Sequence, residues 1–493
     1  MRRRCVSRYA ARVRLASLAL CLALLVPAPA GAVEGTEIAS SFDEGNPFDL
    51  FLGVSYGFMA KRAAIKREMS GAVIDTTPPG AVPVVRDLVF SEDRHVLTPH
   101  AELGIFHDLS LSFALPITLG LSRSYEFDQR ASRCIFPGSG EDPTCINKTN
   151  SSTLIDKILP DGTAGAPLGY DAGDPTTGFP LDSTTVFKSV GRSGLDTVNL
   201  GISWAPMNQD RDDTKPTWVL TAEFRLSVGK IMRFNRLDPE TETGVSRGVH
   251  EFYAETVVSK RTRWAEPFVY FWWQAPLGVR GNRANDPNGS LYWDVGFGQR
   301  TAKPQQHAGT LFGFEAIVYN KPESDERVNL EVSGRIDAHF NGVGYSEIWE
   351  VLALGGDIEN NPNAPLAIDL DPTRTDDTKV NHPGTSVIEN YLSFGARVGV
   401  NAHVGRYARF GATFELGRDQ THALTYDDAG RELPGCGTEP MGQECETPDD
   451  PVVSANTKEV NPLHKQLVDV AGRRYLIDEM TTFTVLVNGM LVF

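Results

Sequence analysis

Histidines and charged residues recur at every second position in several stretches of the chain, and their chemistry needs an explanation. A histidine beside a carboxylate can act as a general base, and histidines clustered with acids can hold a metal ion. No serine-centred turn, His-Glu zinc helix or phosphate-binding loop accompanies them in the sequence. We therefore expect hydrogen-bonded structural groups, and we predict that the chain is not an enzyme and holds no metal or cofactor. The residues are His100, Glu102, Glu223, Arg225, Glu315, Glu331, Arg335, Asp337, His339, Arg397, His403, Arg409 and Glu415.

These polar residues alternate with large apolar ones, and this period indicates the elements that position them. Between 109 and 122 every odd position is a large apolar residue, and every even position except Pro116 is small or polar. A period of two is that of a β-strand with one apolar and one polar face. The run at 97–105 alternates in the same way, and the His107-Asp108 link between the two runs is short enough for a tight hairpin.

The same alternation recurs along the chain, so we predict an all-β fold of about twelve antiparallel strands. Other clear runs lie at 50–58, 198–204, 218–228, 328–340, 392–401 and 409–416, with weaker ones at 249–259, 266–275 and 309–319. Consecutive strands should pair through hairpins, and the first strand should close on the last. An extra hairpin at 291–299 would raise the count.

The connections between these runs alternate in length. Short ones lie near 107–108, 206–216, 260–265, 320–326 and 405–408, and long polar ones near 61–93, 126–191, 231–248, 277–308, 341–387 and 419–474. Short turns on one side and long loops on the other are typical of a single transmembrane β-barrel of the outer membrane, with short periplasmic turns and long extracellular loops. A soluble β-sandwich also alternates and is the competing fold.

Two further features favour the membrane barrel. Aromatic residues gather at Trp264 and within 268–273, as a girdle at the lipid headgroups requires, although an aromatic core is the alternative. The chain ends in an alternating run, 481–493, whose last residue is Phe493. This run resembles the terminal strand by which the assembly machinery recognises bacterial outer-membrane barrels. A barrel in hydrocarbon must leave no unpaired edge, so this strand should close the sheet.

The N-terminus has the form of a secretory signal. Six arginines within 2–14 precede the apolar run 15–26, and small-residue cleavage sites end at Ala32. We predict a signal peptide at 1–32, a short periplasmic segment at 33–45 and an outer-membrane barrel at 46–493. A signal anchor is the alternative for the first segment. Both termini should be periplasmic, and the location is the outer membrane of a Gram-negative bacterium.

Charge and cysteine content restrict the partners and the compartment. Without the signal, 41 basic residues remain against 63 acidic ones, a net charge of about −22, which argues against nucleic acid as a partner. Cys134 and Cys145 share one loop rich in glycine, proline and acids, and Cys436 and Cys445 share another. We expect two local disulfides in an oxidising compartment, with a zinc site as the alternative.

Several short motifs of the chain resemble those of one group of outer-membrane barrels. The stretch 97–116 resembles the second hairpin of transporter-like outer-membrane proteins of the phenol meta-pathway type. The likeness continues at Gly194-Leu195-Asp196, Ala205-Pro206, Pro216-Thr217-Trp218 and Gly313-Phe314-Glu315. The resemblance implies a barrel for the passage of small solutes, apolar ones among them. The chain departs from it in its long cysteine-bearing loops, and it differs from long-chain fatty-acid transporters in having no sizeable N-terminal plug.

If the apolar face meets lipid, the polar residues named above line the lumen. Their Glu and Arg side chains either pair and stiffen a narrow interior or line a pore that prefers cations and neutral solutes. The first hypothesis is a passive channel or transporter for small solutes. The alternative is a non-conducting envelope or surface protein whose long loops bind a partner. The other expected partners are outer-membrane lipids and lipopolysaccharide, and the assembly machinery through Phe493.

Overall fold

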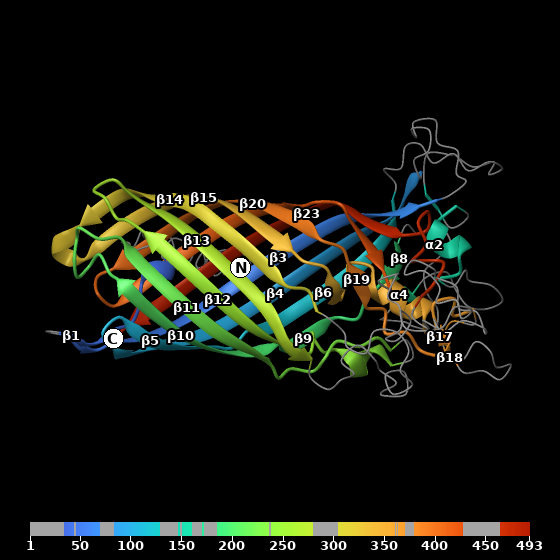
Figure 1. Cartoon of the computed structure of the whole chain (residues 1–493), viewed down its shortest axis with the longest axis horizontal. Helices are drawn as coiled ribbons and strands as arrows, with labels where there is room; N and C mark the ends of the chain where they lie inside the picture. Colours follow the sequence, from blue (N-terminus) through green and yellow to red (C-terminus); the bar gives the residue numbers. More distant parts are fainter. Residues whose placement is uncertain are drawn as a thin grey trace, which may run out of the picture.

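The described part of the chain forms a closed, antiparallel β-barrel of twelve strands, as predicted (Figure 1). The structure is a computed structural model that describes residues 34–43, 46–69, 83–128, 146–147, 150–159, 170–171, 185–235, 238–279, 304–359, 361, 363–369, 379–426 and 464–493. The barrel strands are β3 (Leu50–Glu68), β4 (Val84–Phe106), β5 (Leu109–Ala114) continued by β6 (Ile117–Phe127), β10 (Thr197–Met207), β11 (Thr217–Ser227), β12 (Val249–Ser259), β13 (Ala265–Val279), β14 (His307–Lys321), β15 (Glu326–His339), β20 (Tyr391–Val404), β21 (Ala408–Asp419) and β23 (Tyr475–Val492).

Each barrel strand pairs with its neighbour in the chain, and the last pairs with the first. Strand β23 runs antiparallel to β3 over most of its length, with Phe483 opposite Ala60 and Leu491 opposite Leu52. Backbone hydrogen bonds of 3.0 Å in both directions join Leu50 and Phe493. The predicted closure is therefore confirmed, and the closing pair leaves neither β3 nor β23 as a free edge.

The two ends of the barrel differ, as the alternation of connection lengths predicted. Figure 1 shows hairpin turns and the C-terminus at its left end and the long connections at its right end. The long connections are shorter than expected because the strands run further. Strand β3 continues to Glu68 and β4 begins at Val84, so much of the span 61–93 is sheet.

The outer face of the wall is apolar. Large hydrophobic side chains that alternate along the strands are about half exposed, among them Leu111 (46%), Phe224 (49%) and Phe414 (49%). Such a continuous exposed apolar surface is unfavourable in water and matches the lipid-facing band of an outer-membrane barrel. At the short-turn end Trp264 (72%) and Tyr407 (69%) are still more exposed, as expected of interfacial aromatic residues.

The predicted aromatic girdle on β13 is only partly correct. Phe271 and Trp273 point outward, but Phe268, Tyr270 and Trp272, which alternate with them, point into the lumen. Phe268 and Leu311 are buried there, with Tyr270 and Trp272 packed against them. The prediction failed because aromatic residues occupy both faces of this strand, so its period could not show which of them meet lipid.

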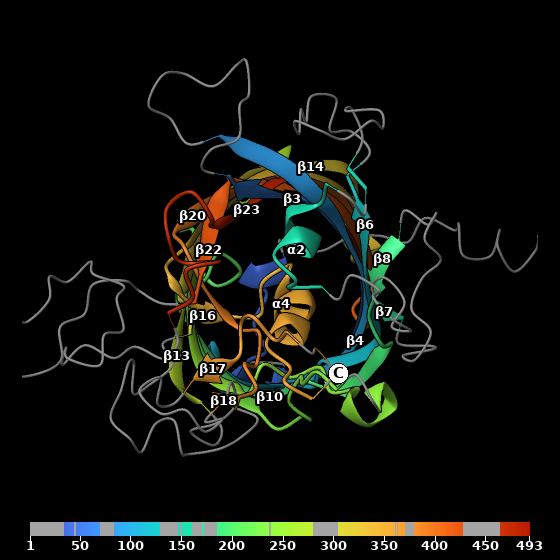
Figure 2. The same cartoon turned by 90° about the vertical axis from the view of Figure 1, so that its right-hand side faces the viewer.

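Short elements from the long loops fold against the strand ends at the loop side. Figure 2 shows helices α2 (Ser152–Ile155) and α4 (Trp349–Gly355) within the ring of strands. Short strands accompany them: β7 (Tyr170–Asp171), β8 (Thr185–Lys188), β9 (Arg192–Leu195), β16 (Gly342–Gly344), β17 (Ile368–Asp369), β18 (Lys379–Val380), β19 (Ser386–Ile388) and β22 (His422–Thr425). In the described chain no helix has the length and apolarity to cross a membrane.

Before β3, the chain forms a short helical turn η1 (Glu34–Thr36) and the small hairpin β1 (Ser41–Asp43) and β2 (Asn46–Phe48). The remaining 3-10 turns are η3 (Pro239–Glu242) and η4 (Pro322–Ser324). The predicted signal peptide, the cysteines Cys134, Cys145, Cys436 and Cys445, and the extra hairpin at 291–299 lie outside the described residues.

Candidate functional site

All thirteen residues predicted to line the lumen lie on barrel strands, on the face opposite the exposed apolar residues. Strand pairing places some of them directly opposite one another: Arg397 lies opposite Glu415, and His403 lies opposite Arg409. They are His100 and Glu102 on β4, Glu223 and Arg225 on β11, Glu315 on β14, Glu331, Arg335, Asp337 and His339 on β15, Arg397 and His403 on β20, and Arg409 and Glu415 on β21.

Most of these charges pair with one another, within a strand or between strands one or two places apart in the sheet. Arg397 lies 3.2 Å from Glu331, and Arg335 lies 3.2 Å from Glu415 and 2.7 Å from Asp337. A carboxylate in such a low-dielectric position is stabilised by a bonded arginine. Glu315 differs, because its carboxylate accepts hydrogen bonds from the amides of Asn329 and Asn401 instead. The charges of the inner wall are therefore largely balanced by one another.

Close approach inside the wall depends on glycines. The His100 ring lies over Gly53, where an added Cβ would come within 2.2 Å of His100 Nε2. Trp272 lies over Gly309 in the same way, at 2.2 Å. The inward-facing large rings therefore pack across strands onto positions that have no side chain.

Near the loop end of the wall, a histidine links two further residues. The Nδ1 atoms of His339 and His307 are 2.8 Å apart, and His339 Nε2 lies 3.1 Å from Ser393 Oγ. The His339 ring also stacks on Tyr391, with ring centroids 4.2 Å apart. A serine, a base and a second polar group in series can activate a hydroxyl, although Ser393 is only 5% exposed. The sequence pointed to His339 but missed its partners, which belong to strands 32 and 54 residues away.

The short-turn mouth contains the segment that precedes β3. The amide of Gly35 donates to Tyr270 Oη (3.0 Å), and that of Ala39 donates to Glu102 Oε1 (2.9 Å). Glu37 forms an ion pair with Arg409 on β21. These contacts fix the segment across the mouth.

Beside this segment lies a cavity of about 740 Å³. Its wall is strongly charged, with Arg261, Arg327, Arg406 and Arg409 facing Glu37 and three aspartates. Arg261 is already paired with Asp210 at 3.2 Å and with Glu266 at 3.1 Å. The cavity lies within the size range of ligand pockets, about 300–1,000 Å³.

The loop mouth is filled by a compact apolar cluster, which we call the cap. Some of its buried residues lie at the loop-side ends of the barrel strands, such as Ile65 and Tyr475. Others come from the loops, such as Leu154, Leu352 and Val468. The side-chain alternation of β3 ends here, because Ala63, Ala64 and Ile65 are all buried. The loop-side end of β3 is thus covered by protein on both faces.

Buried polar contacts fix the helices of the cap. The Asp87 carboxylate, fully buried on β4, accepts four hydrogen bonds from Ser151, Ser152 and Thr153 at the start of α2. Glu350 of α4 forms an ion pair with Arg192 at 2.9 Å, and both side chains are almost completely buried. The cap is therefore anchored to the barrel wall rather than loosely placed over it.

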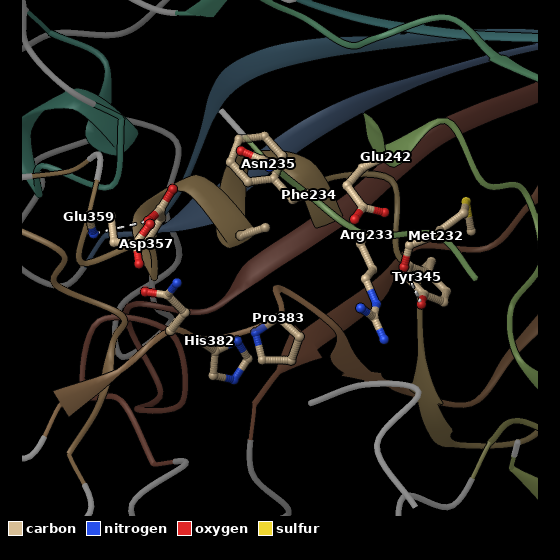
Figure 3. A pocket seen from close by; sticks show the side chains of 12 residues that line it. Met232, Arg233, Phe234, Asn235, Glu242, Tyr345, Asp357, Glu359, His382 and Pro383 are labelled. Atoms are coloured by element: carbon tan, nitrogen blue, oxygen red, sulfur yellow. Dashed lines mark hydrogen bonds between the residues drawn. The ribbon is translucent and has the colours of Figure 1, made fainter. Parts of the chain in front are cut away.

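A cavity of about 210 Å³ lies between the cap and the loop that contains η3 (Figure 3). Met232, Arg233 and Tyr345 line one side of it, and Asp357 and His382 line the other. The Tyr345 hydroxyl donates to the carbonyl of Met232 (2.9 Å). Burial lowers the pKa of His382 to about 3, and this neutral imidazole accepts from the Gly384 amide at 2.9 Å.

Known proteins were compared with the chain. Neither a protein-family model nor a curated protein matches it. The COG4313 outer membrane channel from Pseudomonas putida F1 aligns at 10% identity, over 93% of this chain and 100% of that chain, with a TM-score of 0.37. The outer membrane protease OmpT from Escherichia coli aligns at 8% identity over 93% and 100%, with a TM-score of 0.28. A Pseudomonas aeruginosa FadL homologue aligns at 8% identity over 90% of each chain, with a TM-score of 0.28. The phenol meta-pathway family is not confirmed.

The prediction that the chain is not an enzyme requires correction. A solved outer-membrane protease is among the aligned barrels. The barrel fold does not establish enzymatic activity, and the lack of linear motifs does not exclude it. The exclusion rested on the lack of linear motifs. A barrel assembles side chains from strands far apart in sequence, as it does with His307, His339 and Ser393, and linear spacing cannot detect such a group.

Proposed function

We propose that the barrel is a passive outer-membrane channel for small solutes. The observation that carries the proposal is the cavity of about 740 Å³ inside the short-turn mouth, beside the segment that crosses it. A barrel whose only role is to hold surface loops needs no charged chamber there. The second cavity, lined in part by α4 of the cap, lies at the opposite end of the same barrel. Both mouths are constricted, so the solute is small.

We further propose that the solutes of this channel are small and apolar. The inward-facing group of Phe268, Tyr270, Trp272 and Leu311 supports this class, because it gives the otherwise polar wall an apolar surface. Aromatic and aliphatic side chains with few polar groups are the usual lining of small-molecule sites. The paired charges elsewhere on the wall present little net field to a neutral solute.

Single-channel recording in planar bilayers tests the channel. The purified, folded barrel should give small, discrete conductance steps. A variant that lacks residues 34–43 should give larger steps, because the segment across the short-turn mouth is removed while β3 and β23 remain paired. Absence of steps from both proteins, each shown to be folded by its heat-modifiable mobility on gels, would refute the channel.

The same experiment addresses the second candidate, a non-conducting surface protein whose loops bind a partner. The cap favours this candidate, because its apolar core and buried ion pairs close the loop mouth. If the cap is a permanent seal, the deletion variant should remain silent as well. Conductance that appears only in the deletion variant would place the block at the short-turn mouth.

A further inference from the structure

A row of three basic side chains crosses the inner wall at the short-turn mouth. Arg327 on β15 lies opposite His403 on β20, and His403 lies opposite Arg409 on β21. Strand pairing places these residues side by side, and all three line the cavity of about 740 Å³. The two guanidinium groups are always charged, so they favour an anion beside them, and the imidazole between them can donate a further hydrogen bond.

The carboxylate of Glu37 lies over this row. It forms an ion pair with Arg409, and its Oε2 lies 3.8 Å from His403 Nε2. Glu37 belongs to the segment that precedes the barrel, not to the wall. It therefore reaches the row as a bound acid would, from inside the lumen.

Glu37 does not satisfy the row. Within the described residues, Arg409 Nε and Nη1 and His403 Nε2 are buried without a hydrogen-bond partner. An arginine fork is matched by two carboxylate oxygens that bind in parallel. The site therefore has more donors than its present occupant uses.

An apolar surface adjoins the same segment. The amide of Gly35, two residues before Glu37, donates to the hydroxyl of Tyr270, which packs with Phe268, Leu311 and Trp272. Two residues of extended chain span at most about 7 Å. The segment thus connects an aromatic surface to the basic row over a length comparable with a small molecule that has one apolar and one acidic end.

We infer that this row binds the carboxylate of small solutes with an apolar body, and that Glu37 occupies the site when no solute is present. The inference rests on the proposed channel and narrows its solute class. A solute carboxylate displaces Glu37 from Arg409 and His403, and its apolar body takes the aromatic surface. Displacement also frees the segment that crosses the mouth.

Calorimetric titration of the full barrel in detergent with benzoate tests the site. The Glu37→Gln variant removes the competing carboxylate, and it should bind benzoate at least tenfold more tightly than the unmodified protein. The double variant Glu37→Gln/Arg409→Gln should lose this gain, and Glu37→Gln/Arg409→Lys should retain only part of it, because lysine keeps the charge but not the fork. Benzyl alcohol, the neutral probe, should bind all variants equally.

Ser40→Ala is the matched control. Ser40 also holds the segment, through the Asp108 amide at 3.0 Å and Arg211 at 3.1 Å, but it belongs neither to the basic row nor to the residues that line the cavity. Its substitution should change the affinity for benzoate far less than Glu37→Gln does. An equal gain in Ser40→Ala and Glu37→Gln would mean general loosening of the segment and would overturn the inference, as would equal affinities of the unmodified and Glu37→Gln proteins.

The conductance experiment keeps the two proposals apart. A barrel that conducts but gains no affinity for benzoate in Glu37→Gln retains the channel and loses the carboxylate site. A barrel that shows the affinity changes but passes no current retains the site and loses the channel.

Discussion

The two mouths of this barrel are narrowed by different kinds of interaction. At the loop end, apolar side chains from the loops and upper strands form a buried core, fixed by the hydrogen bonds to Asp87. At the short-turn end, a segment of about ten residues is held by single hydrogen bonds and by the Glu37–Arg409 ion pair beside an open cavity. Buried apolar area is cooperative and strong, whereas separate polar contacts are weak and replaceable. The comparison identifies the short-turn mouth as the easier one to open.

The largest effect should come from the anchor of the cap. Asp87→Ala removes the acceptor of four buried hydrogen bonds at the start of α2, which should cost the cap about 3–5 kcal/mol. Limited proteolysis within the loops should accelerate strongly while the barrel remains intact. Asp93→Ala, an exposed position on the same strand, is the control and should change little. Equal protease resistance of both variants would show that α2 does not depend on Asp87.

The next effect concerns the barrel wall between the two mouths, whose outer face should meet lipid and whose inner face should meet the lumen. Leu111→Arg, on the outer face, should cost about 2–4 kcal/mol if the residue lies at the bilayer midplane. Ser112→Arg, on the inner face, should cost much less. Unfolding by urea in lipid vesicles measures both variants. Equal costs would mean that the assignment of the two faces is wrong.

The cap should also respond to acid through His382. Its pKa is lowered to about 3 by burial, with a smaller contribution from Lys465. Below the unfolded value of about 6.5, only the unfolded state takes up the proton, so stability falls as the pH decreases from about 6.5 to 3, by up to about 1.4 kcal/mol per unit. Hydrogen exchange of α4 amides between pH 7 and 5, corrected for intrinsic rates, measures the slope.

His382→Asn is the matched variant for this slope, because its amide oxygen can still accept from Gly384. The variant should lose the pH dependence without losing the cap. If the slope persists, another group is responsible for it.

The smallest effect should be at the short-turn mouth. Ser40 Oγ accepts hydrogen bonds from the Asp108 amide (3.0 Å) and from Arg211 (3.1 Å). Ser40→Ala should loosen the segment by about 1 kcal/mol. Faster hydrogen exchange at Gly35 and Ala39, with unchanged exchange in α4, would confirm that the mouths open independently. Faster exchange at both ends would contradict the comparison.

Part of the fold and of the site could be predicted from the sequence. The period of two determined the strands, and alternating connection lengths determined which end has the long loops. The same period assigned residues such as Glu331 and Arg397 to one face, because an alternating side chain can lie only on one of two sides. It could not find His307 or Ser393 as partners of His339, since register between distant strands is not visible in local sequence.

The sequence by itself thus determined a closed barrel with an apolar outside, because lipid requires every backbone group to be paired and every second side chain to be apolar. Only the tertiary structure decided which rings of β13 face inward, where the segment before β3 lies and how the loops close their mouth. On β13 both faces are aromatic, so polarity does not distinguish them. The cap and the Glu37 contact join residues hundreds of positions apart, and such contacts depend on the shape of the assembled barrel rather than on any local period.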